Sequence, residues 1–476
     1  MNTRSNESEQ RAQGLRRRAS APALIGMITV ALVACGDDEA GTETDAADTT
    51  GEVSESSAGT GEPAGVRYWQ DVAPIYFERC GSCHSEGGIA PFRLDNYADA
   101  VTWAEASRLA TEARTMPPWL VTSDGSCGEF RDSKALSQEE IDTIAAWIDD
   151  GALEGEPRDD LMIPQVDQLA GGVSYTTPEF VPEPEGGIFA EFDEYRCFLI
   201  DPALERDRFM TAYDVVPGNK ALVHHVLAIP VDPTLEVGAG VTNLDVIEAL
   251  DAESPDRDGW PCFGAAGDGV EVEGIPVTWA PGQGVVNFPE GTGYRVQQGD
   301  LLVVQVHYNM ADPEVLGQSD STTVRVRFED SVEREGFFEL PDGFLESLFT
   351  DEPASLPAGQ SSVTFTWDMQ IDGYLQWLGL ESLDVYGVFP HMHEFGRKIQ
   401  MRVDHGDGQG PQCAADVQRW DFDWQLYYFY EEPLTLGPGS SLEVTCDFNT
   451  EGMDEPLWPG WGTKNEMCLM GLFLVP

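Results

Sequence analysis

The sequence predicts a mainly β chain in which a small all-α domain precedes two antiparallel β-sandwich, jelly-roll-like domains. First, β-branched and aromatic runs such as residues 301–308, 323–328 and 363–367 are separated by Gly, Pro, Asp and Asn, which is typical of strands joined by turns. Second, this pattern continues for roughly 290 residues, more than one sandwich needs. Third, residues 136–148 carry apolar residues at helical spacing ahead of the β-rich part.

Composition limits the class of protein. Of the 476 residues, 41% are hydrophobic, enough for cores in two or three domains. The formal net charge of -57 repels phosphate, so we expect no nucleic-acid partner. The expected segments are a signal peptide (1–35), a disordered acidic tether (36–65), the helical domain (66–155), a linker rich in Pro, Gly and acid (156–185), and two sandwiches (186–335 and 336–476).

The first residues are typical of an export signal. Arg16, Arg17 and Arg18 precede an apolar stretch too short to span a bilayer, and Leu32-Val-Ala-Cys35 follows. This ending resembles the lipobox of bacterial lipoproteins, which predicts lipidation of Cys35; an ordinary secretory signal is the alternative. We therefore expect an exported protein, periplasmic or at the cell surface, attached to a bacterial membrane through the lipid alone.

A C-x-x-C-H motif follows the tether. Cys80-Gly-Ser-Cys83-His84 ends an apolar stretch with helical spacing, and this motif predicts a covalently attached c-type haem. Cys80 and Cys83 would form the thioether bonds, and His84 would be the proximal iron ligand. A zinc half-site or a redox disulfide is the alternative, but the added His and the export signal favour haem.

Two further features complete the predicted haem domain. Met116, which precedes two prolines, is the expected sixth iron ligand, with core packing as the alternative. Ser137 and Glu140 form a capping-box pattern at the start of a closing helix. In this order the features of residues 66–155 resemble a class I cytochrome c domain, which implies an electron carrier. That resemblance does not explain Cys127.

The remaining histidines cluster in the β-rich part. The chain has 7 His, and in so His-poor a sequence a His-His pair, a strand His and a His-x-His favour metal binding, although any one alone would more often be a core residue. The x between two His places both imidazoles on one face of a strand. Imidazole suits Cu, Zn, Fe and Ni. The candidate ligands are His224, His225, His307, His391 and His393, whereas His405 lies in a polar loop and is expected at the surface.

Four motifs in order resemble the copper type II, ascorbate-dependent monooxygenases, the group of peptidylglycine α-hydroxylating and dopamine β-monooxygenases. They are Lys220-Ala-Leu-Val-His-His-Val-Leu227, Val304-Gln-Val-His-Tyr308, His391-Met-His-Glu-Phe-Gly-Arg-Lys398 and Asn465-Glu-Met-Cys468. The resemblance covers residues 190–476. It implies one copper held by His224, His225 and His307, and a second held by His391, His393 and Met467. The weak Met467 thioether favours Cu(I) and leaves room for oxygen, which places oxygen activation at the second copper.

The same resemblance bears on the cysteines and the substrate. Cys446 and Cys468 resemble a disulfide pair of the family's second domain, which would fix the Met467 strand. The pairings of Cys127, Cys197, Cys262 and Cys413 stay open. Peptide-hydroxylating members hold the substrate carboxylate with an Arg, an Asn and a Tyr; the corresponding residues here are Phe389, Leu469 and Gly471. We therefore expect a small apolar or aromatic substrate instead of a peptide.

The leading hypothesis is a monooxygenase that hydroxylates a C–H bond with O2. Its two electrons would come through the haem, or from ascorbate or a redox protein. One alternative is a non-catalytic haem and copper lipoprotein for electron transfer or metal binding. Another is an interaction module with structural zinc, which leaves the haem motif unexplained.

Overall fold

The computed structural model describes residues 65–476 except 89, 165–167, 185–191, 263–264, 351, 423 and 461–464. The predicted signal peptide, Cys35 and the tether up to residue 64 lie outside these residues. Among the helices that are described, none combines the length and the apolar character that a membrane span requires.

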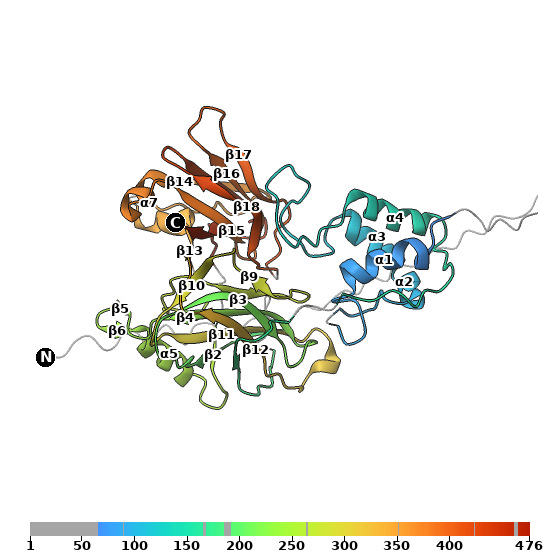
Figure 1. The fold of residues 1–476 in the computed structure, drawn as a ribbon, viewed down its shortest axis with the longest axis horizontal. Coiled ribbons are helices and arrows are strands. Elements are labelled where there is room, and N and C mark those ends of the chain that lie inside the picture. The colour runs from blue at the N-terminus through green and yellow to red at the C-terminus, as the bar shows by residue number, and fades with distance from the viewer. Residues whose placement is uncertain are drawn as a thin grey trace, which may run out of the picture. The chain divides into compact units, whose positions relative to one another are not determined.

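Helices come first in the described chain (Figure 1). The predicted capping box is present: the Ser137 side chain accepts from the Glu140 N–H and the Glu140 carboxylate accepts from the Ser137 N–H. Tyr68, Tyr76 and Trp147 are fully buried in the core that these helices share. The helices are η1 (Tyr68–Val72), α1 (Ala73–Ile75), η2 (Tyr76–Cys80), α2 (Tyr97–Thr102), α3 (Ala104–Glu112) and α4 (Gln138–Asp149).

The rest of the described chain is mainly β and forms several antiparallel sheets. The largest sheet has the order β1-β12-β3-β10-β13-β20-β15-β18, with β9 paired to β3; its pairs are antiparallel except β10 with β13. Its strands are β1 (Val173–Thr176), β3 (Arg208–Val216), β9 (Val286–Asn287), β10 (Thr292–Val296), β12 (Thr323–Glu329), β13 (Arg334–Glu339), β15 (Leu383–His391), β18 (Tyr428–Leu436) and β20 (Leu469–Val475).

Two smaller sheets pack against the largest one. The first has the order β7-β2-β11-β4-β8 and the second β14-β19-β16-β17; β5 and β6 form a separate pair. Their strands are β2 (Asp193–Ile200), β4 (Val223–Val231), β5 (Glu236–Gly238), β6 (Val241–Thr242), β7 (Trp260–Pro261), β8 (Val277–Trp279), β11 (Leu301–Asn309), β14 (Val363–Gln370), β16 (Gly396–Asp404), β17 (Gln412–Val417) and β19 (Ser441–Phe448). The remaining helices are α5 (Asn243–Ala252), η3 (Pro313–Val315), α6 (Gly343–Glu346), η4 (Ser347–Phe349) and α7 (Ile371–Leu378).

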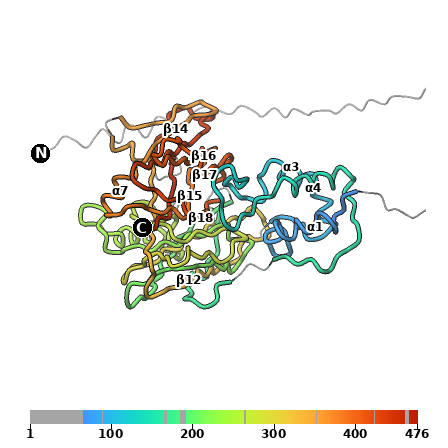
Figure 2. The backbone as a smooth tube through the Cα atoms, turned by 45° about the horizontal axis from the view of Figure 1, so that its top comes forward, coloured from blue at the N-terminus to red at the C-terminus, as the bar shows by residue number. Residues whose placement is uncertain are grey.

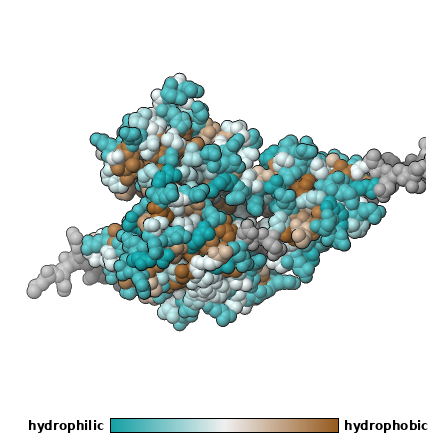
Figure 3. Space-filling model, in the orientation of Figure 1, coloured by the Kyte–Doolittle hydropathy of each residue, from teal (hydrophilic) through white to brown (hydrophobic). Residues whose placement is uncertain are grey.

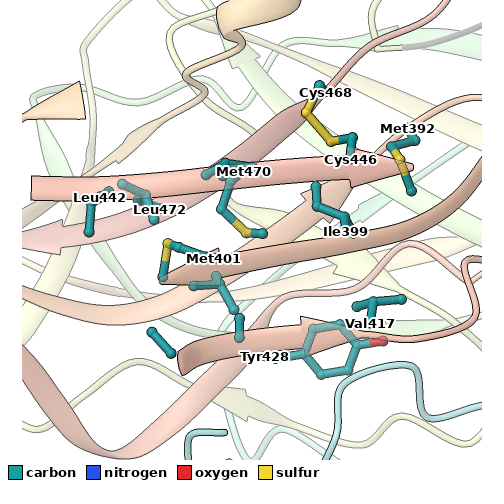
Figure 4. Packing of buried hydrophobic residues seen from close by; sticks show 14 of the residues in the cluster. Met392, Ile399, Met401, Val417, Tyr428, Leu442, Cys446, Cys468, Met470 and Leu472 are labelled. Atoms are coloured by element: carbon teal, nitrogen blue, oxygen red, sulfur yellow. A yellow bond between two sulfur atoms is a disulfide. The ribbon is translucent and has the colours of Figure 1, made fainter. Parts of the chain in front are cut away.

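Each smaller sheet encloses a core with the largest sheet; burial alternates along β14 and β19, whereas β4, β11 and β20 are buried at nearly every position. Val226 and Val304 of the five-stranded sheet pack with Tyr213 of the largest sheet. Figure 4 shows the other core, which includes Ile399 and Met401 of the four-stranded sheet and Met470 and Leu472 of the largest sheet. Side chains that alternate between faces allow each strand to bury one apolar row while the other row stays polar. Accordingly, the face of the molecule in Figure 3 is mostly hydrophilic.

One sheet contains strands from both segments that the sequence predicts as sandwiches. Phe337, Phe338 and Glu339 of β13 pair with Leu474, Phe473 and Leu472 of β20. The first half of β13 pairs with β10 and its second half pairs with β20, so β13 joins the strands of the two halves. The two halves are thus fixed to each other by a shared sheet as well as by the chain (Figure 1).

Residues 119–131 differ from the expectation that they belong to the helical domain. Val121 pairs with Val417 and Phe130 with Tyr430, on β17 and β18, and Figure 2 shows this segment beside both strands. The Trp119 ring meets the Tyr428 ring edge-on at 5.0 Å. Apolar side chains of this loop complete the β-sheet core, which explains why they do not pack among the helices.

Candidate metal centres

The structure brings His224, His225 and His307 together. His225 on β4 pairs directly with His307 on β11, and the ladder shifts between His307 and Tyr308. One ligand nitrogen from each of the three residues lies within 4.8 Å of the others. The two Nδ1 atoms of His225 and His307 are 3.1 Å apart. This convergence of imidazoles is what a transition-metal site requires.

Neighbouring side chains orient His307. Its Nε2–H donates to Asp193 Oδ1 at 3.0 Å, and Asn309 donates to the same oxygen at 2.7 Å. The Tyr195 ring stacks on the imidazole at 4.1 Å between centroids. A carboxylate that holds one ring nitrogen selects the tautomer whose other nitrogen is a ligand. His307 Nδ1 therefore faces the cluster as an acceptor.

Burial keeps this cluster neutral. It lowers the pKa of His225 and of His307 well below the usual value, and neighbouring imidazoles lower both further. The pKa of His224 is lowered by the same cause. His224 Nδ1 is buried without a hydrogen-bond partner among the described residues. Neutral imidazole is the form that binds a metal, and a buried acceptor without a donor suits a cation.

A second pair forms at the end of β15. The His391 and His393 ring centroids are 5.3 Å apart, while Met392 between them is buried in the core. The alternation expected from His-x-His therefore holds, although β15 ends at His391 and His393 lies just beyond it. Figure 4 shows Met392 among the core side chains.

In both rings of this pair the Nδ1 atom takes part in a hydrogen bond. His391 Nδ1–H donates to Gln425 Oε1 at 2.9 Å, and His393 Nδ1–H donates to the Asn465 carbonyl at 2.9 Å. These tautomers place the lone pair on Nε2 in each ring. Burial, with the neighbouring His393, lowers the pKa of His391 to about 3, and burial also lowers the pKa of His393.

Glu466 ties Met467 to the His-x-His segment. Its Oε2 accepts from the N–H of His393 at 2.8 Å and of Met467 at 3.0 Å, and its Oε1 accepts from Phe395 at 2.8 Å. Glu466 is fully buried, and burial raises its pKa to about 8. Met467 is itself 1% exposed. One carboxyl group therefore joins the Met467 backbone to the His393 backbone.

The predicted disulfide between Cys446 and Cys468 is formed, next to Met467. The structure also resolves the pairings that stayed open, Cys127 with Cys413 and Cys197 with Cys262. Cys127, unexplained by the cytochrome resemblance, thus joins the 119–131 segment to the edge strand β17. His405 is half-buried in the loop between β16 and β17.

The C-x-x-C-H motif lies at the end of η2. The Cys80 and Cys83 thiols are free, and burial raises the pKa of both, to about 12 for Cys80. His84 Nδ1–H donates to the Phe92 carbonyl at 3.0 Å, which leaves the lone pair on Nε2. Met116 lies on the loop after α3 and is 41% exposed. Its role as an iron ligand stays a prediction.

Sequence reasoning missed the partners that orient these histidines. Asp193, Gln425 and the Asn465 carbonyl are far from their imidazoles along the chain, and nothing local marks them. Glu466 did carry a signal, because it is an acid at the start of an apolar run that begins with Met-Cys-Leu-Met.

A known protein family matches the segment that contains the second histidine pair, His391 and His393. Residues 345–474, which contain His391, His393 and Met467, match the model of the copper type II ascorbate-dependent monooxygenase, C-terminal domain. This match and the relatives described below support an assignment to the copper type II, ascorbate-dependent monooxygenase family. The chain also aligns with named relatives. DBH-like monooxygenase protein 1 of Homo sapiens is 24% identical over 292 residues, covering 60% of this chain and 42% of that protein.

Two further relatives carry activities in their names. Tyramine beta-hydroxylase of Caenorhabditis briggsae is 23% identical, covering 55% of this chain and 41% of its own length. Peptidyl-glycine alpha-amidating monooxygenase A of Xenopus laevis is 25% identical, covering 44% of this chain and 21% of its own length. The chain thus spans less than half the length of these monooxygenases. A solved structure of the infectious bursal disease virus VP2 subviral particle covers 65% of this chain and 73% of its own at 9% identity, but its TM-score is only 0.16.

Proposed function

We propose that this chain is an exported copper-dependent monooxygenase that hydroxylates a C–H bond of a small organic substrate with O2. One observation carries the proposal: three neutral imidazoles on paired strands, two of them buried and that of His224 half-buried, converge within 4.8 Å. The family match over residues 345–474 supports a second site at His391, His393 and Met467. The names of the relatives, two monooxygenases and one hydroxylase, support the class of reaction.

The residues fit copper at both positions. Imidazoles from His224, His225 and His307 would hold the first ion, and His391, His393 and the Met467 thioether the second. The His224 Nδ1 atom, which is buried without a hydrogen-bond partner among the described residues, supports this fit. Copper, when bound, supplies one-electron redox chemistry and oxygen activation.

The chain's own groups fix the ligands. Asp193 accepts a hydrogen bond from one nitrogen of His307, and Gln425 accepts one from a nitrogen of His391. The other nitrogen of each ring is therefore already oriented to bind a metal. Burial keeps the imidazoles unprotonated, so protons compete little with the metal. Glu466 holds the Met467 backbone against the His393 backbone.

An apolar wall beside the second pair favours an apolar or aromatic substrate. Phe389 is parallel to His391 at 6.0 Å and stacks on Tyr427 at 4.9 Å. Phe389 pairs with Gly471 and His391 with Leu469 across β15 and β20. These positions correspond to the carboxylate clamp of peptide-hydroxylating relatives. They are occupied here by Phe389, Gly471 and Leu469, and none of these has a side-chain group that could bind a carboxylate.

A c-type haem at Cys80, Cys83 and His84 would deliver electrons to the first cluster. A Cβ at Gly282 would lie 2.7 Å from Ser82 Oγ and 3.8 Å from Cys83 Sγ, so the motif touches the loop after β8. Trp279 of β8 pairs with Val226 of β4, next to His225. This short path supports electron entry at the first cluster. Ascorbate or a redox protein would reduce the haem or that cluster directly.

Export fits the remaining features. Three disulfides suit an oxidising compartment, and Cys35 would carry the lipid that attaches the chain to a bacterial membrane.

Oxygen uptake tests the function. Copper-loaded protein with ascorbate is screened against phenethylamine-like, acylated and lipid-like compounds, with isotopically labelled O2 and mass analysis of products. We expect one labelled oxygen atom in the product of at least one class. A protein that binds two coppers and passes electrons but never consumes O2 supports the non-catalytic alternative. In a separate anaerobic stopped-flow test, reduced haem that never reduces Cu(II) overturns the haem relay.

A further inference from the structure

We propose that the electron crosses from the first histidine cluster to the second through Trp424 and Gln425, two consecutive residues of the loop between β17 and β18. The proposal rests on the proposed function, because it assumes copper at both clusters. It adds a path for the electron between the two clusters, through residues that are not themselves copper ligands.

Each of the two residues contacts a ligand of a different cluster. The Trp424 ring lies 5.6 Å from the His224 ring, at an interplanar angle of 60°. Gln425 Oε1 accepts from His391 Nδ1 at 2.9 Å. One aromatic contact, one main-chain link and one hydrogen bond therefore join an imidazole of β4 to an imidazole of β15.

The loop is held in place from both sides. Gln425 Nε2 donates to the Phe422 carbonyl at 2.8 Å, and the Gln425 side chain is 7% exposed. Trp420 Nε1 donates to the His393 carbonyl at 3.1 Å, which attaches the loop to the second cluster. The Tyr427 N–H donates to Thr278 Oγ1 at 3.3 Å, which attaches it to β8, the neighbour of β4.

The shared sheet holds the two ends of this bridge in one unit. Because β13 pairs with β20, the half that carries His224 and the half that carries His391 are parts of one hydrogen-bonded sheet. A contact across two independently moving domains would open and close. Here the Trp424 contact needs no such closure.

The step balances as a one-electron transfer. The electron comes from ascorbate or the haem, reaches the His224 cluster, and leaves it for the His391 cluster. No bond forms or breaks in this step, and no proton moves, because both imidazoles stay neutral. Trp424 and Gln425 supply the covalent and hydrogen-bonded path and are unchanged at its end.

Trp424→Leu is the direct test, with Trp424→Phe as the variant that keeps a ring. Trp377→Leu is the matched control, since Trp377 is 74% exposed on α7. Fully reduced, copper-loaded protein is mixed with O2 and substrate in a single turnover. Freeze-quench electron paramagnetic resonance follows copper reoxidation, and haem absorbance follows the haem. Metal analysis first establishes two coppers per chain in each variant.

We expect wild type, Trp424→Phe and Trp377→Leu to reoxidise both coppers in one fast phase. Because the two electrons of one turnover come from the two coppers, Trp424→Leu should lose the fast phase of the first copper, and with it any later electron transfer from the haem, while the second copper still reoxidises. A fast phase that survives in Trp424→Leu overturns the route alone, whereas a wild-type protein without any fast phase overturns the proposed function and the route with it. If Trp424→Leu binds fewer than two coppers, Gln425→Met, which removes the hydrogen bond to His391, takes its place: loss of the first copper's fast phase supports the route, and a retained fast phase overturns it.

Discussion

His307 and Asp193 form a hydrogen-bonded pair in which the imidazole Nε2–H donates to the carboxylate over 3.0 Å. The carboxylate fixes the tautomer and the ring orientation of a predicted copper ligand. We expect Asp193→Ala to weaken copper binding at the first cluster by about 10- to 100-fold, the range typical of lost outer-sphere partners. Competition titration against a chelator measures this. The control is Glu352→Gln, at an exposed position; unchanged affinity in Asp193→Ala would show that the pair does not orient the ligand.

Met467 is expected to be essential for oxygen chemistry alone. Met467→Ala should abolish O2-dependent turnover while haem reduction by ascorbate stays intact. Met467→Leu separates loss of the thioether from a core cavity, because it conserves volume. Met470→Leu, at a neighbouring position that is also 1% exposed, is the control. Turnover at the wild-type rate in Met467→Leu would remove Met467 from the ligand set.

Met116 is expected to tune the haem and nothing else. Met116→Ala should change the haem absorption spectrum and lower its reduction potential, because a Met ligand raises the potential. Copper content should stay at the wild-type level. Met162→Ala serves as the control, since Met162 is 83% exposed. A spectrum and potential identical to wild type would assign Met116 to packing.

Asp342 makes stability depend on pH. Its Oδ1 accepts from the N–H groups of Phe344, Leu345 and Cys468, and burial raises its pKa to about 6. Because the folded pKa lies above the ordinary 3.8, the stabilisation is complete below the ordinary value and is lost as pH rises through about 6.

Asp342→Asn keeps the acceptor and cannot ionise. Relative to wild type it should gain unfolding free energy between about pH 4 and 7, on the order of 3 kcal/mol at about 1.4 kcal/mol per pKa unit. Urea unfolding at several pH values measures this, with Asp368→Asn at an exposed position as control. A difference that does not change with pH would mean that Asp342 does not titrate in this range.

The Cys127–Cys413 disulfide is expected to hold residues 119–131 on β17. Replacing both cysteines with Ser should destabilise the protein by about 2–5 kcal/mol and expose this segment to limited proteolysis. The Cys197→Ser, Cys262→Ser double variant should also lose stability but keep the segment protected. Equal protection in the Cys127 and Cys413 variant would show that β-sheet contacts suffice.

The sequence identified the elements whose signals are local. A His-His pair, a strand His and a His-x-His stand out because the chain has few histidines, and β-branched runs between turns indicate strands. The partners of those histidines depend on long-range pairing: Asp193 reaches His307 only because β2 and β11 are neighbours. Likewise, the β13–β20 pairing and the packing of residues 119–131 on β18 arise from how separate apolar faces meet, and no single window of sequence contains both faces.

Copper stoichiometry tests the central claim most directly. Wild-type protein is loaded with Cu(II), freed of excess metal, and measured by metal analysis and electron paramagnetic resonance, beside His225→Ala and His391→Ala. We expect two type 2 coppers per wild-type chain and one in each variant, lost from different sites. One copper in the wild type, a preference for zinc, or variants that keep both ions would contradict the assignment of two copper centres to these histidines.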